Sequence, residues 1–268
     1  MLAYSPRLRW VQSITVGVEP FLTPAFVAAR HIVFTSTKGP MAVSMAEHAV
    51  ALLLALARDL RALAADQEGK RWRSGAEISA SGGMIELCGR TMAVLGVGAV
   101  GSHLACICTA GFGMRVLGMS RVRRNDPNVD RWFDRADLHV MLREADVVAL
   151  AMPDTPSTNR IIDAAALAAM KPSAYLINVS RGALVDEAAL VEALRTGRIA
   201  GAGLDAFPVE PLPTDSPLWS APNVVMTPHI SPRTAAVGPR MVDLWCENIR
   251  RFAERQPLLG LVDRQAGY

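Results

Sequence analysis

A short apolar run that leads directly into a glycine cluster constrains the fold of this chain more than any other feature. Residues 91–95 carry no charge and predict a buried strand, and Gly96, Gly98 and Gly101 follow it with the spacing GxGxxG. Residues 102–110 then predict a helix. In such a strand–turn–helix the first glycine makes the tight turn, the second lets the backbone approach a pyrophosphate, and the third lets the helix pack on the strand.

The start of that helix favours an anionic ligand. Its first N–H groups have no partner within the helix, and the helix dipole places partial positive charge at the same end. The turn therefore predicts a dinucleotide site that includes Gly96, Gly98, Ala99, Val100 and Gly101. The alternative is an ordinary structural turn, because glycine clusters also occur without a ligand.

Composition narrows the class of protein. The chain has 268 residues, of which 51% are hydrophobic and 20% are charged, which is enough for two domains with a large core. A net charge of +3 gives no argument for nucleic acid or for an anionic membrane. The N-terminus lacks the apolar core of a signal peptide, and the longest apolar run, 49–57, is too short to span a bilayer. We therefore expect a cytoplasmic protein.

Four cysteines show no metal-ligand spacing. We expect free, mostly buried thiols in a reducing compartment, and no metal site.

Strands and helices alternate regularly after residue 90. Strands are expected at 91–95, 115–119, 146–151, 174–178, 199–204 and 224–226, and helices at 99–110, 136–144, 159–169, 186–196 and 234–254. This alternation predicts an α/β fold with a parallel, doubly wound sheet. Two further short strands are expected at 8–12 and 31–35.

The longest helical pattern covers residues 40–65. Ser44 and Glu47 form a possible capping box at its start. Its apolar residues run nearly all round, which predicts burial between domains or against a partner subunit. His48 lies in this helix and is expected to be a hydrogen-bonded interface residue. The charged stretch that follows, as far as residue 81, is expected to be loop or frayed helix.

The tip of the second strand bears on the choice of cofactor. A dinucleotide fold for NAD commonly carries an acid there, which binds the adenosine ribose. Here Met119, Ser120 and Arg121 occupy the tip, and Arg123 and Arg124 follow. Guanidinium groups bind phosphate in a forked, charge-assisted geometry, so NADP is favoured over NAD. The alternative is a solvated basic loop without selectivity.

Three later strands end in residues that suit catalysis. Arg181 follows the strand at 174–178, and an arginine there can hold a carboxylate and polarise a carbonyl. Glu210 lies in a proline-rich turn that suits a fixed carboxylate, and His229 follows Pro228 at the end of the last strand. A histidine paired with a carboxylate can act as a general acid. Together with the dinucleotide turn, these residues indicate reduction of a 2-oxo acid.

The chain resembles the D-isomer-specific 2-hydroxyacid dehydrogenases over nearly its whole length. The matching stretches are 10–13 with Gly17, 45–48, 96–101, 152–158, 178–186, 205–211 and 227–231. The pair Ser120-Arg121 is similar to that of the family's NADPH-dependent glyoxylate and hydroxypyruvate reductases.

The resemblance assigns roles to individual residues. It implies that Arg181 binds the substrate carboxylate and oxo group, that His229 is the acid/base, and that Glu210 is its partner. The backbone around Gly17 would hold the substrate carboxylate. Further cofactor contacts are expected from the nicotinamide-end Asp205 and from Pro153, Thr158 and Val179.

The resemblance also implies two domains and a partner. Residues 44–231 would form a Rossmann-type dinucleotide domain, and 1–43 with 232–268 an incomplete flavodoxin-like substrate domain. Members of the family begin earlier, so we expect a shortened or mis-assigned start, an exposed sheet edge, and low solubility or dependence on oligomerisation. A homodimer through the long helix is implied by the same resemblance.

Three functions compete. The first is an NAD(P)-dependent enzyme that reduces a small 2-oxo acid to the D-2-hydroxy acid. The second is a sensor or scaffold that binds the cofactor without turnover, which the shortened substrate domain favours. A formate or phosphonate oxidoreductase fits less well, because the carboxylate position Glu210 is retained.

Overall fold

The structure is a computed structural model that describes residues 5–80, 84–123 and 125–268. It divides into two compact units. The smaller contains Met1–Ser44 and Pro232–Tyr268, and the larger contains Met45–Ser231. Among the described residues, no helix is long and apolar enough to cross a bilayer.

The larger unit is built on a parallel sheet. Its described residues form seven strands in the order β5-β4-β3-β6-β7-β8-β9. Their bounds are β3 Thr91–Leu95, β4 Arg115–Met119, β5 Arg131–Phe133, β6 Val147–Leu150, β7 Tyr175–Asn178, β8 Gly201–Leu204 and β9 Val224–Met226. The expected doubly wound, Rossmann-type sheet is confirmed, and all six expected strands are present. The additional strand, β5, was not expected.

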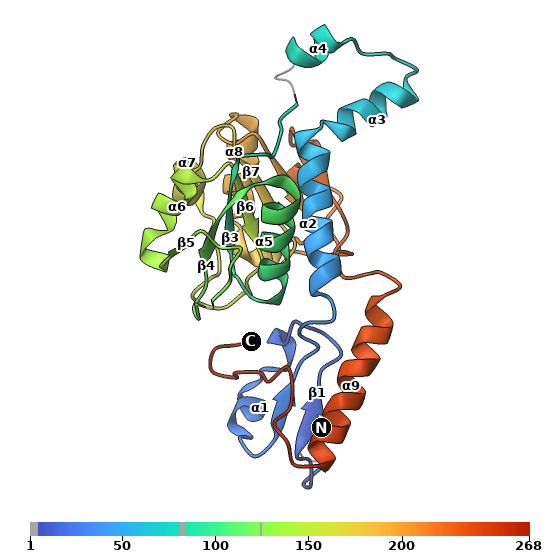
Figure 1. The fold of residues 1–268 in the computed structure, drawn as a ribbon, viewed down its shortest axis with the longest axis vertical. Helices are drawn as coiled ribbons and strands as arrows, with labels where there is room; N and C mark the ends of the chain where they lie inside the picture. The colour runs from blue at the N-terminus through green and yellow to red at the C-terminus, as the bar shows by residue number, and fades with distance from the viewer. Residues whose placement is uncertain (1–4, 81–83, 124) are drawn as a thin grey trace. The chain divides into compact units, whose positions relative to one another are not determined.

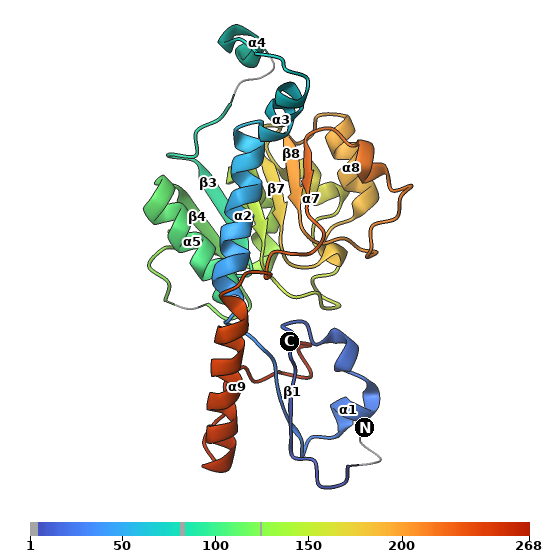
Figure 2. The same cartoon turned by 90° about the vertical axis from the view of Figure 1, so that its right-hand side faces the viewer.

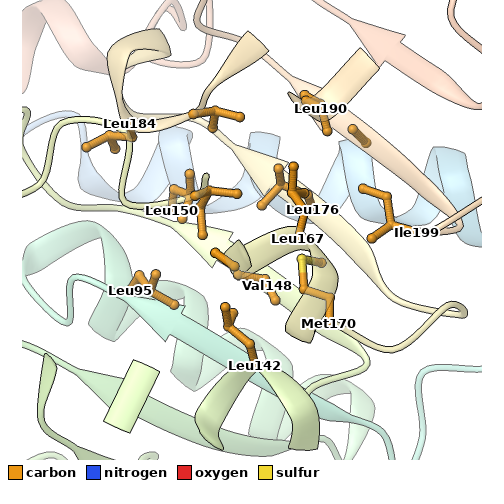
Figure 3. Close-up of a cluster of buried hydrophobic side chains, with 14 of the residues drawn as sticks. Leu95, Leu142, Val148, Leu150, Leu167, Met170, Leu176, Leu184, Leu190 and Ile199 are labelled. Atoms are coloured by element: carbon orange, nitrogen blue, oxygen red, sulfur yellow. The ribbon is translucent and has the colours of Figure 1, made fainter. Parts of the chain in front are cut away.

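Helices cover both faces of this sheet (Figures 1 and 2). One face carries α2 (Ala42–Ala57) and α5 (Ala99–Phe112), and the other carries α6 (Leu138–Glu144), α7 (Ala164–Ala169) and α8 (Glu187–Arg195). Strands buried on both faces are continuous apolar runs, and successive side chains alternate between the two cores. In β6, Val148 and Leu150 enter the core beneath α6, α7 and α8 (Figure 3), whereas Val147 and Ala149 enter the other.

Several helix boundaries differ from the expectation. The helix expected at 40–65 ends at Ala57, and α3 (Leu60–Glu68) starts after Asp59, whose φ of 50° is left-handed. The capping-box prediction is wrong, because α2 begins at Ala42 and the Ser44 hydroxyl donates to the Met41 carbonyl at 3.0 Å. The stretch expected to be loop or frayed helix contains α3 and α4 (Gly75–Ala80).

The helix expected at 159–169 starts only at Ala164. Asp163 is its N-cap and accepts a hydrogen bond from the Ala166 N–H at 2.8 Å. The helix α8 agrees with the expectation, since the Asp186 side chain caps its start and Gly197, with φ of 66°, follows its end.

The smaller unit pairs two short strands with two helices. Its described residues contain the parallel strands β1 (Trp10–Gln12) and β2 (Val33–Thr35), the short helix α1 (Pro24–Ala28) and the long helix α9 (Val237–Ala253). Trp10 stacks on Phe252 of α9 with ring centroids 5.2 Å apart. The fully buried Asn248 of α9 donates to the Gln12 side chain at 2.9 Å. These contacts fix α9 on the strands.

The four cysteines are free, as expected, but only Cys108 is buried. The expectation of mostly buried thiols is therefore wrong for the other three. Burial raises the pKa of Cys108 to about 12, so this thiol is inert at neutral pH.

Candidate active site

The glycine turn lies where the strand order reverses. β3 pairs with β4 on one side and with β6 on the other, so the turn opens at the topological switch point, where open α/β sheets bind ligands. A Cβ added to Gly96 would lie 2.6 Å from the Ala151 backbone, and one added to Gly101 would lie 2.2 Å from the Gly96 oxygen. Both positions require glycine for close packing.

Gly98 is different, because a Cβ added there meets no heavy atom within 4 Å. It is the N-cap of α5 and supplies no side-chain cap, so the first N–H groups of the helix face this open space. The residues Ala99 and Val100 open the helix. A pyrophosphate fits this cradle, and the chain is therefore suited to hold a dinucleotide.

The tip of β4 adjoins the turn. Met119 pairs in register with Leu95, and the Gly96 N–H donates to the Met119 carbonyl at 2.8 Å. Ser120 and the exposed Arg121 follow directly.

The Arg123 guanidinium donates to Asp134 at 2.6 Å, but the two side chains are 49% and 70% exposed. Such an exposed pair contributes little, so a phosphate could displace Asp134 at small cost. Arg124 lies outside the described residues.

One hydroxyl group, that of Thr158, holds the loop after β6 in its conformation. The Thr158 hydroxyl donates to the Pro153 carbonyl at 2.7 Å and accepts from the Thr155 N–H at 2.8 Å. Ser180 donates to the Met152 carbonyl and ties this loop to the end of β7. Val179 is buried in the core beneath α2 and α5, so only its backbone is available to a ligand.

Three neighbouring strands bring the expected catalytic residues to one edge. Asn178, Leu204 and Met226 pair in register at the carboxyl ends of β7, β8 and β9. Each strand end is followed within a few residues by a polar group of the site. These groups are Arg181 after β7, Asp205 and Glu210 after β8, and His229 after β9.

Arg181 is held by a buried amide. The fully buried Asn178 donates to the Arg181 carbonyl at 2.9 Å and accepts from the Ser180 N–H at 3.0 Å. A Cβ added to Gly182 would lie 1.9 Å from the Phe207 carbonyl carbon. The turn that carries Arg181 therefore packs directly on the backbone of the loop that leads to Glu210.

His229 and Glu210 form a hydrogen-bonded pair. The His229 Nδ1 lies 2.8 Å from Glu210 Oε2 and 3.0 Å from Oε1. An ionised carboxylate only accepts, so Nδ1 carries a proton and Nε2 is left to exchange one. Glu210 Oε1 also accepts from the Phe207 N–H at 2.9 Å, which fixes the carboxylate. The side chains of His229 and Glu210 are 37% and 36% exposed.

Asp205 lies beneath this pair and is fully buried. Its Oδ1 accepts from the Thr227 hydroxyl at 2.6 Å and from the Ile230 N–H at 2.9 Å, and its Oδ2 accepts from the Ser231 N–H at 2.8 Å. These bonds hold the backbone on both sides of His229. Its expected contact with the nicotinamide end stays a prediction.

Two residues of this network, His48 and Thr227, had no predicted role in the site. The His48 Nε2 of α2 lies 2.8 Å from the Thr227 hydroxyl. A polar side chain on a helix that is otherwise apolar nearly all round was the signal that could have indicated it.

Gly17 belongs to the smaller unit, in the loop after β1. Its carbonyl accepts from the Thr15 hydroxyl at 2.7 Å. Its expected role in binding a carboxylate stays a prediction. Within the described residues, no group of three or more His, Cys, Asp or Glu side chains is arranged to hold a metal ion.

A phosphate cradle beside a carboxylate-paired histidine is the arrangement of a nicotinamide-dependent oxidoreductase, in which a side chain exchanges the proton and the dinucleotide exchanges the electrons. The family described as "D-isomer specific 2-hydroxyacid dehydrogenase, NAD binding domain" matches residues 50–231. The chain belongs to the D-isomer-specific 2-hydroxyacid dehydrogenases.

Individual proteins to which the chain is similar indicate its place within the family. Glyoxylate/hydroxypyruvate reductase B of Pectobacterium carotovorum is 38% identical over 235 residues, which cover 87% of this chain and 72% of that protein. Glyoxylate reductase of Aeropyrum pernix is 37% identical over 99% of this chain and 79% of its own length. The crystal structure of an NADPH-dependent glyoxylate/hydroxypyruvate reductase from Sinorhizobium meliloti, in complex with NADP and sulfate, is 30% identical. The superposition covers all of this chain and 83% of the Sinorhizobium meliloti chain, with a TM-score of 0.85.

These findings confirm the expected family, the oxidoreductase class acting on CH–OH donors, and a nicotinamide dinucleotide as the cofactor. The alternative of a sensor without turnover is not favoured, since the similar proteins are reductases.

Proposed function

We propose that this chain reduces glyoxylate, hydroxypyruvate or a similarly small 2-oxo acid to the D-2-hydroxy acid, with NADPH as the preferred cofactor. The observation that carries the proposal is the His229–Glu210 pair, 2.8 Å apart, at the same sheet edge as Arg181. The substrate class is that of the named reductases to which the chain is similar.

The roles of the chain's own residues follow from this geometry. Glu210 fixes the proton on Nδ1 and stabilises the imidazolium, so His229 donates the Nε2 proton to the oxo oxygen. The Arg181 guanidinium holds the substrate carboxylate and polarises the neighbouring oxo group. Backbone N–H groups around Gly17, in the loop after β1, would bind a substrate carboxylate. When bound, the reduced nicotinamide supplies the hydride equivalent to the oxo carbon.

The dinucleotide would be held mainly by backbone groups. The N–H groups of Ala99, Val100 and Gly101 at the start of α5 suit the pyrophosphate, and the loop from Pro153 to Thr158 adjoins the same switch point. Val179 and Asp205 would lie toward the nicotinamide end. Ser120, Arg121 and Arg123 suit a 2′-phosphate, which supports NADP over NAD.

The assembly and location are part of the proposal. Residues 44–231 act as the dinucleotide domain, and 1–43 with 232–268 as the substrate domain. The chain works as a homodimer, which is supported by α3 and α4: neither buries a residue, and Trp72 between them is 95% exposed. Three exposed free thiols support a reducing compartment, the cytoplasm.

The test is the loss of NADPH absorbance with glyoxylate, hydroxypyruvate, pyruvate and phenylpyruvate. His229→Ala should abolish turnover, while His139→Ala, which removes an exposed imidazole on α6, should not. No turnover by the wild-type dimer with any of the four acids, despite measurable NADPH binding, would refute the proposal.

A further inference from the structure

We propose that His48 is a positioning residue for the reaction: through Thr227 and Asp205 it fixes the loop that carries His229. The inference rests on the proposed function of His229. It concerns a chain of hydrogen bonds that starts on α2 and ends at the backbone on the far side of the catalytic imidazole.

The direction of the hydrogen bonds follows from proton counting. A hydroxyl has one proton to donate, and Thr227 gives it to Asp205 Oδ1 at 2.6 Å. The Thr227 oxygen must then accept from His48 Nε2, 2.8 Å away. His48 is therefore in the form whose Nε2 carries a hydrogen. Both hydrogen bonds, from His48 to Thr227 and from Thr227 to Asp205, are donated in the direction of Asp205.

Asp205 connects this series of hydrogen bonds to the loop that carries His229. Its carboxylate is fully buried, and it accepts from the N–H groups of Ile230 and Ser231 at 2.9 and 2.8 Å. Together with the Thr227 hydroxyl, these two N–H groups give Oδ1 two hydrogen bonds and Oδ2 one. Because a buried carboxylate relies on its donors to offset the cost of burying the charge, loss of one donor destabilises the arrangement in which Asp205 holds the loop.

The loop needs this hold because His229 is strained. Its φ is 54°, in the left-handed region, which only a few per cent of residues other than glycine adopt. Such a conformation persists only where the surroundings determine it. Asp205 clamps the two residues that follow His229, and Thr227 precedes it by two positions. His48 thus links this loop to the long helix α2.

His48 also lies 3.6 Å from Asp205 Oδ1, and its side chain is 21% exposed. His48 is close enough to stabilise the buried Asp205 carboxylate, but the Thr227 hydroxyl lies between His48 and the backbone of the loop. These contacts distinguish a positioning role from a catalytic one, because His48 reaches His229 only through Thr227 and Asp205.

The test compares four single variants and the double variant His48→Phe/Thr227→Val in the full-length chain. His48→Phe removes the donor and keeps a ring, His48→Gln keeps an N–H donor, and Thr227→Val removes the hydroxyl while retaining the shape. Glu47→Gln, on the exposed side of the same helix, is the matched control. We measure kcat, the KM for NADPH, and hydrogen exchange of residues 227–231.

We expect His48→Phe and Thr227→Val each to lower kcat about tenfold and to leave the KM for NADPH within about twofold. Residues that act as one unit are not additive, so the double variant should be no slower than Thr227→Val alone. His48→Gln should recover most of the activity. Exchange of residues 227–231 should become at least about tenfold faster in both single variants, and Glu47→Gln should change nothing.

Additive losses in the double variant, or kcat within about twofold of wild type in Thr227→Val, would overturn the inference. If the wild-type chain turns over none of the 2-oxo acids, the proposed function fails, and exchange alone decides. Faster exchange in both single variants then supports the positioning role, and unchanged exchange overturns it.

Discussion

Glu210→Gln tests whether the charge of Glu210 drives the proton donation by His229. The substitution keeps the side-chain shape and an oxygen that can accept from the Phe207 N–H, now 2.9 Å from the carboxylate. It replaces the charged carboxylate by a neutral amide, whose oxygen in the Oε1 position can still accept from the His229 Nδ1, 3.0 Å away, while an NH2 group takes the place of Oε2. A change in activity would therefore report on electrostatics and not on loop structure.

The magnitude follows from distance and exposure. Two unit charges about 4 Å apart interact by about 1 kcal/mol in water and by about 4 kcal/mol at an effective dielectric constant near 20. The two side chains are 37% and 36% exposed, so solvent screening reduces the upper figure. We take about 2 kcal/mol, which corresponds to a loss of about thirtyfold in kcat/KM for the 2-oxo acid.

The assay is steady-state reduction of glyoxylate and hydroxypyruvate with NADPH near neutral pH. NADPH affinity and thermal stability should match those of wild type. Glu192→Gln, which removes an exposed carboxylate on α8, is the control and should keep full activity. A loss smaller than about threefold, or about 0.7 kcal/mol, would refute the electrostatic argument.

Four other substitutions probe the cofactor site and the fold. NADPH should bind at least about tenfold tighter than NADH in fluorescence titrations, and Arg121→Ala should remove most of that difference; equal affinities in the wild type would contradict the assignment. Gly98→Ala should keep the wild-type melting temperature but weaken dinucleotide binding, since its Cβ meets open space, whereas Gly101→Ala should lower the melting temperature because its Cβ would lie 2.2 Å from a backbone oxygen. Burial acts to raise the pKa of Asp146, but hydrogen bonds from Lys171 and a backbone N–H outweigh it and leave that pKa lowered. The stability from Asp146 is therefore present above the usual carboxyl pKa and lost as pH falls through the lowered one, so Asp146→Asn should flatten the acid limb of a denaturation curve measured against pH.

Much of the larger unit could be predicted because buried parallel strands are continuous apolar runs. β3, β4 and β9 have the expected bounds. The strand β5 could not be found in this way, since Arg131–Phe133 begins with a charged, exposed residue and is not a continuous apolar run. The break in the long helix at Asp59 and the late start of α7 at Ala164 depend on local capping and turn conformations that the apolar pattern does not reveal.

The residues of the candidate site could be predicted from the sequence where they follow the ends of strands. Arg181, Glu210 and His229 were predicted because the carboxyl ends of parallel strands share one edge. The pairing of His48 with Thr227 was not, because the two residues are 179 positions apart in the sequence and meet only once α2 packs on the sheet. A single sequence without its fold contains no signal for such a pair.

The strand order has a consequence for biosynthesis. β3 can pair with β4 early, but its other neighbour, β6, lies beyond β5 and α6 in the chain. Until Val147–Leu150 leaves the ribosome, one edge of the apolar strand Thr91–Leu95 stays unpaired, and an unpaired edge of this kind is a template for aggregation. The finished sheet ends instead in the three-residue strands β5 and β9, which offer little edge to another chain. We therefore expect nascent chains to expose this apolar edge while the segment between β3 and β6 is synthesised, and to cover it when β6 pairs with β3.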